Sequence, residues 1–344
     1  MEYLEGMLQK EKDNFSRVCN RLLGTCFLCK GNQNTKADYY FVLKYRKEFK
    51  TPRILVRGVF MTYKKKICLE KSMITSTSNQ QMKNLMLLMK KAKARNEQEL
   101  FVVEGRKMFQ EVPEEWLKQV YVSESFFAEN DKMLAGYTYE IVSDSVFKAV
   151  SDTQTPQGIL CLVRKPQYRL EELLKGADTH LLILESIQDP GNLGTMLRTG
   201  EGAGISGVVM NHTTVDLFNP KTIRSTMGSI YRMPFFVTRD LTETICELKT
   251  AGVKTYAAHL RGTMQYDEPD YTGATAFMIG NEGNGLSDET ADLADAYIKI
   301  PMCGQVESLN AAISASLLMY ETNRQRRIRS MSQDRMSNIR KVEE

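Results

Sequence analysis

The chain has 344 residues, of which 42% are hydrophobic, and this is enough for two domains with cores of their own. Its longest apolar runs, such as 181–184 and 85–89, are far too short to cross a bilayer, and its first residues lack the order of a signal peptide. Seven irregularly spaced cysteines argue against a disulfide framework, so we expect a cytoplasmic protein without a membrane partner.

The net charge of +4 is unevenly distributed along the chain. Residues 1–75 hold 16 Lys and Arg against 7 Asp and Glu, whereas the remainder holds 30 against 35. A nucleic-acid surface on this mildly acidic remainder must therefore be local. The candidate basic groups, each of which could equally be a solvated helix face, are Lys83, Lys90, Lys91, Lys93 and Arg95; Lys221 and Arg224; and Arg324, Arg326, Arg327 and Arg329.

Residues 1–78 form a basic extension that differs from the rest of the chain. They mix cysteines, aromatic residues and lysines without a sustained period of 2 or 3.6, and they lead into the polar run 75–81, which has the composition of a disordered link. We expect much of this extension to be poorly ordered. Because Met73 or Met82 could begin a complete protein, it stays open whether the extension belongs to the native chain.

Cys26 and Cys29 have the spacing of half a zinc site. No second pair and no nearby histidine completes such a site, and the whole chain has only 3 histidines. We therefore expect no bound metal.

Residues 79–166 have the pattern of a compact α/β unit. A helix that carries Leu85, Leu88 and Met89 on one side opens it. Four short apolar strands are expected at 100–103, 120–122, 139–142 and 158–163, with helices near 106–110 and from 124 and 143. Residues 167–179 form the linker to the next unit.

A second alternation of strands and helices extends over residues 180–329 and is followed by a tail at 330–344. The apolar runs that predict its strands are 181–184, 207–210, 234–237, 255–258, 277–279 and 297–300. Short continuous apolar strands that alternate with helices indicate a buried, mostly parallel sheet. The last helix, 311–329, carries an apolar stripe that we expect to face the core, made of Leu309, Ala312, Ile313, Ser316, Leu317 and Tyr320.

Residues 202–207 match the G-x-G-x-x-G pattern of dinucleotide-binding loops. That pattern binds pyrophosphate only when it follows a strand and opens a helix. Here the glycines end the helix that runs to Ala203 and lead into the strand at 208–210, and glycine is common where helices stop. A nucleotide-dependent dehydrogenase is therefore a weak alternative.

Three loops that follow predicted strands, 189–198, 279–286 and 300–310, are rich in glycine and asparagine. In an open α/β sheet the ligand crevice lies beyond the carboxyl ends of the strands, so these loops predict one composite site. Their glycines allow the backbone to approach a ligand closely. Apolar neighbours such as Ile300 and Leu309 would suit an adenosine with an amino-acid tail.

The reactive-looking side chains of these loops also have ordinary structural explanations. Arg198 offers a planar fork for a phosphate or carboxylate, or it pairs with a surface acid. Glu282 stands in a glycine-rich turn, where it could accept hydrogen bonds from local amides. Ser308 could cap the last helix, because serine is a preferred N-cap residue, and capping would not exclude catalysis.

The three loops together resemble the signature motifs of the SpoU (TrmH-type) branch of the SPOUT RNA methyltransferases. The motifs here are Asn192-x-Gly194-x-x-x-Arg198, Gly280-Asn-Glu282-Gly-x-Gly285-Leu and Ile300-Pro-Met-x-Gly304-x-x-x-Ser308-Leu-Asn310. Segment 216–228 resembles the family's connecting region. Residues 79–166 are similar to the L30e-like substrate-binding domain that often precedes this catalytic domain. One departure is Gly200, where the family commonly has alanine.

The resemblance implies a C-terminal α/β domain with a deep trefoil knot, and a homodimer whose active site is shared between the subunits. It implies that S-adenosylmethionine binds in the knot, in contact with Gly280, Ile300 and Leu309. The methyl group would go to a ribose 2′-hydroxyl, which requires RNA rather than DNA. The family's catalytic residues correspond here to Asn192, Arg198, Glu282, Ser308 and Asn310.

The same resemblance favours ribosomal RNA as the substrate, through the first domain. Transfer RNA stays an alternative, as does a non-catalytic RNA-binding or assembly protein on the same scaffold. The high pKa of arginine argues against a free neutral base, so we expect Arg198 to hold a phosphate and to stabilise a developing alkoxide. Which nucleotide is methylated, and which group accepts its proton, stay open.

Overall fold

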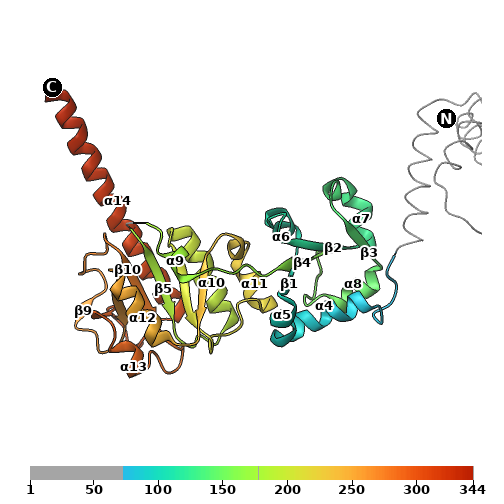
Figure 1. Ribbon diagram of the computed structural model, residues 1–344, viewed down its shortest axis with the longest axis horizontal. Coiled ribbons are helices and arrows are strands. Elements are labelled where there is room, and N and C mark those ends of the chain that lie inside the picture. Colours follow the sequence, from blue (N-terminus) through green and yellow to red (C-terminus); the bar gives the residue numbers. More distant parts are fainter. Residues whose placement is uncertain (1–72, 177, 344) are drawn as a thin grey trace, which may run out of the picture. The chain divides into compact units, whose positions relative to one another are not determined.

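The computed structural model of the protein describes residues 73–176 and 178–343, with side chains up to residue 333 (Figure 1). Most of the basic extension, including Cys26 and Cys29, lies outside the described residues. The described part contains a four-stranded sheet in a first domain and a seven-stranded sheet in a second. In these ranges, no helix is both long enough and apolar enough to span a membrane.

The first domain is built on a sheet with the strand order β1-β4-β2-β3. Its strands are β1 (Leu100–Glu104), β2 (Leu117–Ser123), β3 (Tyr139–Val142) and β4 (Ile159–Arg164). β4 runs antiparallel to β1 and β2, whereas β2 and β3 are parallel. All four predicted strands are present, and β2 begins earlier than its apolar run indicated.

Helices cover both faces of this sheet. On one face, α4 (Gln80–Lys90) and α8 (Asp144–Val150) bury Leu85 and Phe147 against Val102. The strand neighbours Phe101 and Val103 point to the opposite face, because side chains alternate along a strand, and they share a core with α6 and α7. The remaining helices are α5 (Ala92–Gln98), α6 (Arg106–Glu111), α7 (Glu124–Asn130) and the 3₁₀ turn η1 (Asp131–Leu134).

The polar run before α4 is a defined turn that leads into the helix, rather than a disordered link. Ile74 is buried, its N–H donates to the carbonyl of Ile141 (2.8 Å), and its carbonyl accepts from the N–H of Ser143 (2.9 Å). Asn79 then caps α4, since its side chain accepts a hydrogen bond from the N–H of Gln81 (2.8 Å). The ordered part of the domain therefore includes residues that the composition had assigned to the extension.

The second domain is built on a sheet with the strand order β7-β6-β5-β10-β8-β11-β9. In chain order the strands are β5 (His180–Leu184), β6 (Gly207–Asn211), β7 (Phe235–Thr238), β8 (Lys254–Ala258), β9 (Met264–Gln265), β10 (Thr275–Ile279) and β11 (Ala296–Lys299). Every neighbouring pair is parallel, and the central strands β5 and β10 are buried throughout. The predicted mostly parallel sheet is confirmed, and only the short β9 was not expected.

Helices also cover both faces of this larger sheet. α10 (Pro190–Ala203) and the start of α14 (Ala311–Glu343) pack together, and Leu193 and Leu318 share a core with Phe277. On the other face, Leu173 and Ile245 share a core with Met278. The other elements are α9 (Leu170–Leu173), α11 (Pro220–Thr226), the 3₁₀ turn η2 (Ser229–Tyr231), α12 (Leu241–Thr250) and α13 (Asp288–Ala291).

Half of the stripe that we expected to face the core is exposed, and Leu309 and Ser316 are only half-buried. Ala312 is buried, but Ile313, Leu317 and Tyr320 are 50%, 37% and 49% exposed. The buried residues of this stretch are instead Ala312, Ala315, Leu318 and Met319. The helix therefore buries a face that is rotated from the predicted one, and Ile313, Leu317 and Tyr320 lie on its outer side. The prediction for Ile313, Leu317 and Tyr320 was therefore wrong.

α14 also continues through the segment that we had treated as a tail. The helix runs from Ala311 to Glu343, and this stretch contains neither glycine nor proline to stop it. The glycine stop at the end of α10 is confirmed, because Gly204 has a left-handed φ of 73° and the chain then enters β6.

The path after β11 brings the end of the domain back to its beginning. β10 lies between β5 and β8, and residues 300–310 then lead from β11 to α14, which packs on α10 and β10. In Figure 1 this region of the chain is found near the labels β10, β5 and α14. It is the region in which the resemblance implies the knot.

Candidate active site

Three side chains from three different loops form one hydrogen-bonded chain. Asn310 Nδ2 donates to Asn192 Oδ1 (3.0 Å), and Asn192 Nδ2 donates to Glu282 Oε1 (3.0 Å). The partners are 118 and 90 residues apart in the sequence. They meet because β5, β10 and β11 are parallel, so that the loops after them emerge at the same edge of the sheet.

Glu282 ties its loop to the start of α10. Its carboxylate accepts hydrogen bonds from the backbone N–H groups of Gln188 and Asp189, both at 3.0 Å, in addition to the bond from Asn192. Partial burial raises the pKa of Glu282, but these three hydrogen bonds outweigh it, and the net pKa lies below its usual value. An ionised carboxylate with its oxygens engaged is a poor proton acceptor, so Glu282 positions the loop.

Asp189 fixes the first turn of α10. Its Oδ1 accepts from the N–H of Asn192 (2.8 Å), and its Oδ2 pairs with Lys221 Nζ (3.3 Å). The bond from the Asn192 backbone, and then the Lys221 ammonium, lower the pKa of this carboxyl group. We did not predict Asp189 and Gln188 as site residues. The order Asp-Pro, an N-cap followed by proline at the first helical position, was a signal for Asp189.

The loop after β10 is a closed turn. The backbones of Asn281 and Gly285 exchange hydrogen bonds of 3.0 and 2.9 Å, and Gly285 has a left-handed φ of 71°. A Cβ at Gly280 would lie 2.0 Å from the carbonyl carbon of Gly285. Gly280 is therefore required by the turn itself, and this turn places Glu282 over α10.

The segment between β11 and α14 is held mainly at its end. Asn310 caps α14, since its Oδ1 accepts from the N–H groups of Ala312 (2.9 Å) and Ile313 (3.3 Å). Ser308 is exposed and does not cap the helix, so the structural alternative that we considered for Ser308 is wrong. Within the part of the chain that the structure describes, residues 301–309 make no hydrogen bond.

Two of the five predicted catalytic side chains stay outside the hydrogen-bonded chain. Arg198 is exposed on α10, and Ser308 is exposed before α14. Neither forms an ion pair or a hydrogen bond with another described residue. The structure therefore brings together Asn192, Glu282 and Asn310 and leaves these two free for a substrate.

α11 packs directly on the helix that carries Asn192 and Arg198. A Cβ at Gly194 would lie 2.4 Å from Ser225 Cβ and 2.6 Å from the carbonyl of Thr222, so only glycine allows this approach. The departure at Gly200 is less constrained, because a Cβ there would lie 2.7 Å from Ile205 Cδ1, the end of a flexible side chain that can shift. Among the described residues, no group of three or more His, Cys, Asp or Glu side chains is placed to hold a metal ion.

Comparison with known proteins decides the family. Residues 179–320 match the model of the SpoU rRNA Methylase family, and residues 79–161 match that of the MRM3-like substrate binding domain. The 23S rRNA (guanosine(2553)-2′-O)-methyltransferase RlmP of Bacillus subtilis (strain 168) is 35% identical over 249 residues, which cover 72% of this chain and 97% of that protein. The chain belongs to the SpoU rRNA methylase family.

Solved structures of RNA methyltransferases have the same fold. The AdoMet-bound rRNA methyltransferase from Sinorhizobium meliloti is 28% identical and has a TM-score of 0.65, with 73% of this chain and 97% of that chain covered. An RNA 2′-O ribose methyltransferase is 31% identical with a TM-score of 0.64, covering 74% and 99% of the two chains. The predicted family, α/β fold and preceding substrate-binding domain are confirmed.

As a SpoU methylase, the chain has an edge of the sheet that fits S-adenosylmethionine. Residues 301–309 offer backbone donors and acceptors that no other described residue uses, between the half-buried side chains of Ile300 and Leu309. A Cβ at Gly304 would meet nothing within 4 Å, so this backbone is open to a ligand. A mixture of free peptide groups and apolar side chains is what an adenosine needs.

Proposed function

We propose that the protein transfers the methyl group of S-adenosylmethionine to a ribose 2′-hydroxyl of ribosomal RNA. The observation that carries this proposal is the chain Asn310–Asn192–Glu282, which joins the three motif loops, together with the exposed and unpaired Arg198 and Ser308 beside it. The Bacillus subtilis relative, a 23S rRNA methyltransferase, supports ribosomal RNA over transfer RNA.

The cofactor would be held by Gly280, Ile300 and Leu309. When bound, it supplies a methyl group already activated on a sulfonium, so the protein has to orient the hydroxyl in line and to help it lose its proton. The turn at Gly280 and the open backbone of residues 301–309 provide the binding edge. Ile300 and Leu309 would exclude water from the transferred group.

Arg198 and Ser308 would act on the RNA. Arginine keeps its charge at any physiological pH, so Arg198 serves as a cation that holds a phosphate and stabilises the developing alkoxide. Ser308 can donate to the ribose or accept from it. Asn192, Glu282 and Asn310 keep the loops in register, so that both groups face the same ribose.

We also propose a homodimer in which each copy completes the site of the other. Arg198 and Gly202 lie on the same face of α10, because they are four residues apart. A Cβ at Gly202 would lie 3.2 Å from Tyr320 Oη, so Arg198 borders the exposed stripe Ile313, Leu317 and Tyr320. A second copy that covers this stripe would bring an Arg198 to a neighbouring site.

The dimer is tested by a charge in the stripe. Leu317→Glu should convert the protein to a monomer in sedimentation velocity and should abolish most methyl transfer, since burying a carboxylate at an interface is costly. Leu87→Glu, on an exposed position of α4, is the matched control and should keep the assembly of the wild type. A wild-type monomer with full activity would overturn the dimer.

We also place the protein in the cytoplasm, in keeping with its free cysteines Cys161, Cys246 and Cys303.

Mass-spectrometric mapping of ribose methylation tests the function directly. RNA from cells with and without the protein should differ at one ribose of ribosomal RNA, and the purified protein with S-adenosylmethionine should restore that mark. A mark lost from transfer RNA would redirect the proposal to that substrate. Failure to bind S-adenosylmethionine in calorimetry, together with an unchanged methylation map, would favour the non-catalytic alternative.

A further inference from the structure

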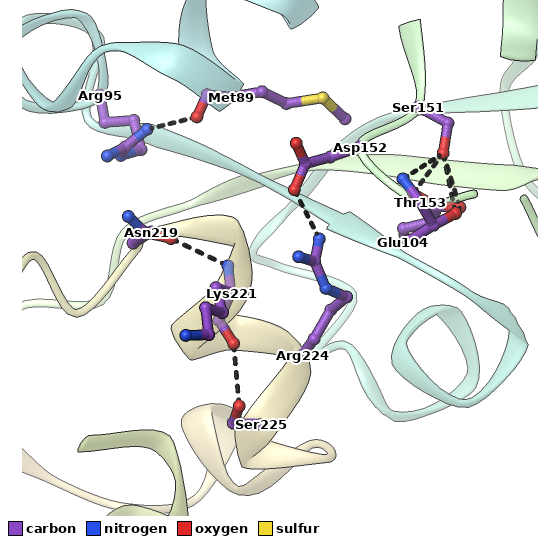
Figure 2. Close-up of polar contacts among 10 residues, drawn as sticks. All are labelled: Met89, Arg95, Glu104, Ser151, Asp152, Thr153, Asn219, Lys221, Arg224 and Ser225. Carbon is purple, nitrogen blue, oxygen red and sulfur yellow. Dashed lines mark hydrogen bonds and ion pairs between the residues drawn. The ribbon is translucent and has the colours of Figure 1, made fainter. Parts of the chain in front are cut away.

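Among the described residues, three ion pairs connect the first domain to the second: Arg95–Asp216, Arg224–Asp152 and Arg232–Glu111. The first two differ in how their arginines are used, and Figure 2 shows Arg95 and the Arg224–Asp152 pair. Arg95, which we had grouped with surface cations, is buried: its side chain is 4% exposed and pairs with Asp216 at 2.5 Å. Its Nε also donates to Asp216 (2.7 Å), and its Nη1 donates to the carbonyls of Leu88 (2.5 Å) and Met89 (3.1 Å). All three guanidinium nitrogens are engaged, so Arg95 is a structural residue.

The second arginine, Arg224 on α11, makes a single hydrogen bond through its guanidinium group. Its Nη1 donates to Asp152 Oδ2 (2.8 Å), and the two side chains are 38% and 50% exposed. Nε and Nη2 of Arg224 have no partner among the described residues. An exposed, singly bonded pair of this kind contributes little to stability.

Asp152 lies in a loop whose conformation is held by hydrogen bonds of its neighbours, not by its own carboxylate. Ser151 Oγ donates to both oxygens of Glu104 (3.0 and 2.8 Å), and Thr153 Oγ1 donates to Glu104 Oε1 (2.7 Å). The residues on either side of Asp152 are thus fixed within the first domain, as Figure 2 shows. From this loop, the carboxylate of Asp152 projects toward the second domain.

Arg224 belongs to a basic strip that leads to the candidate active site. Lys221 lies three residues earlier on α11, so the two side chains are neighbours on the helix surface. Lys221 pairs with Asp189, the residue that caps α10 next to Asn192. The strip therefore runs from the loop of Asp152 to the start of the helix that carries Arg198.

We propose that Arg224 binds a phosphate of the RNA substrate, and that the Asp152 carboxylate occupies this phosphate site until RNA arrives. This inference rests on the function proposed above, and it adds a contact and a means of regulation that the motifs do not contain. A phosphate accepts two parallel hydrogen bonds from a guanidinium, whereas Asp152 takes one, and the unused Nε and Nη2 of Arg224 are available for that geometry.

The domain interface would persist during the exchange. Arg95 and Asp216 stay paired, Tyr231 Oη donates to the carbonyl of Met108 (3.1 Å), and the rings of Phe101 and Phe218 lie 4.8 Å apart. Asp152 would then be a nearby negative charge that weakens RNA binding.

The test uses the full-length protein and a 23S rRNA transcript, with filter binding over a series of salt concentrations. Asp152→Asn keeps the shape and an acceptor for Arg224, and it should tighten binding about two- to five-fold, the range of one exposed ion pair. Arg224→Ala should weaken binding about five-fold and reduce the salt slope by about 1, as expected for one lost phosphate contact. Glu97→Gln removes an exposed carboxylate from the same domain and controls for net charge, so its affinity should equal that of the wild type.

The double variant decides between a phosphate site and a simple interface contact. If Asp152 acts through Arg224, the gain from Asp152→Asn should disappear in Asp152→Asn/Arg224→Ala, which should bind like Arg224→Ala alone. If the pair only joins the domains, Asp152→Asn should bind RNA no better than the wild type, and the proposal is overturned. An equal gain in Glu97→Gln would also overturn it. Wild-type protein that neither binds nor methylates this transcript would instead reject the proposed substrate.

Discussion

The start and the middle of α10 differ in how fully their polar side chains are used. At the start, Asp189 pairs with Lys221 and accepts a hydrogen bond from the backbone of Asn192. The Asn192 side chain bonds to both Glu282 and Asn310. In the middle, Arg198 is exposed without a partner among the described residues. Side chains that bond to one another build the frame of the site, and side chains left free are available for substrate. Loss of the first kind should affect both stability and activity, whereas loss of the second should affect activity alone.

Arg198→Lys should produce the largest effect. Lysine keeps the charge but loses the planar fork, so turnover should fall about 10²–10³-fold, as for removal of a transition-state donor. Binding of S-adenosylmethionine and the free energy of unfolding should be unchanged, because the exposed Arg198 side chain makes no hydrogen bond or ion pair with a described residue. The measurement is methyl transfer from labelled cofactor, with calorimetry for binding. Arg239→Lys, on another exposed arginine, is the control, and unchanged turnover in Arg198→Lys would remove Arg198 from the mechanism.

Glu282→Gln should reduce activity and stability together. The neutral amide replaces a carboxylate that accepts from two backbone amides and from Asn192, so the free energy of unfolding should fall by about 1–2 kcal/mol, at the lower end because the site is partly solvated. Urea titration and methyl transfer would be measured in parallel. Glu289→Gln on α13 is the matched control. Loss of activity with full stability would mean that Glu282, like Arg198, acts on the substrate and does not hold the site together.

The pH dependence of stability should report the same carboxylates. The folded pKa values of Glu282 and Asp189 lie below their ordinary values of 4.5 and 3.8. A lowered pKa stabilises the folded state at pH values above the ordinary pKa, and this contribution is lost as pH falls through the folded value. Between about pH 6 and pH 3, unfolding free energy should therefore fall less steeply in Glu282→Gln than in the wild type. Identical slopes from urea titrations would show that the Glu282 hydrogen bonds are not present in solution.

Asn310→Ala and Ser308→Ala should have the smallest effects of these substitutions, and they should differ in whether they change stability. Asn310 caps α14 and bonds to Asn192, so its loss should cost about 0.5–2 kcal/mol of unfolding free energy. Ser308 is exposed and makes no hydrogen bond in the described part of the chain, so its replacement should leave thermal unfolding unchanged while it slows methyl transfer. A destabilised Ser308→Ala variant would mean that serine shares the capping role.

Much of the second domain could be predicted because its signals are local. Short apolar runs gave the strands, Gly204 gave the end of α10, and the parallel order then required the three loops to meet at one edge. The resemblance grouped the loop residues Asn192, Glu282 and Asn310 in one cluster, and these three do lie together. Their individual tasks were less clear, since Asn310 rather than Ser308 caps α14.

Other features could not be predicted because they depend on partners far away in the sequence. Periodicity marked Ile313, Leu317 and Tyr320 as a core face, but α14 buries a neighbouring face and leaves them exposed. Composition grouped Arg95 with surface cations, but Asp216, 121 residues away, neutralises it inside the protein. Neither outcome follows from a local pattern, because each depends on which surface is available after the chain has folded.

By itself, the sequence determined the order of strands and helices, the motif loops and the family of this protein, because apolar periodicity, glycine stops and motif spacing act over short stretches of chain. Only the tertiary structure decided that Glu282 bonds to the start of α10, that Arg198 is left free, and that Asp152 meets Arg224. Hydrogen bonds and ion pairs are directional and short, so they form only between groups that the packed fold has already brought within reach.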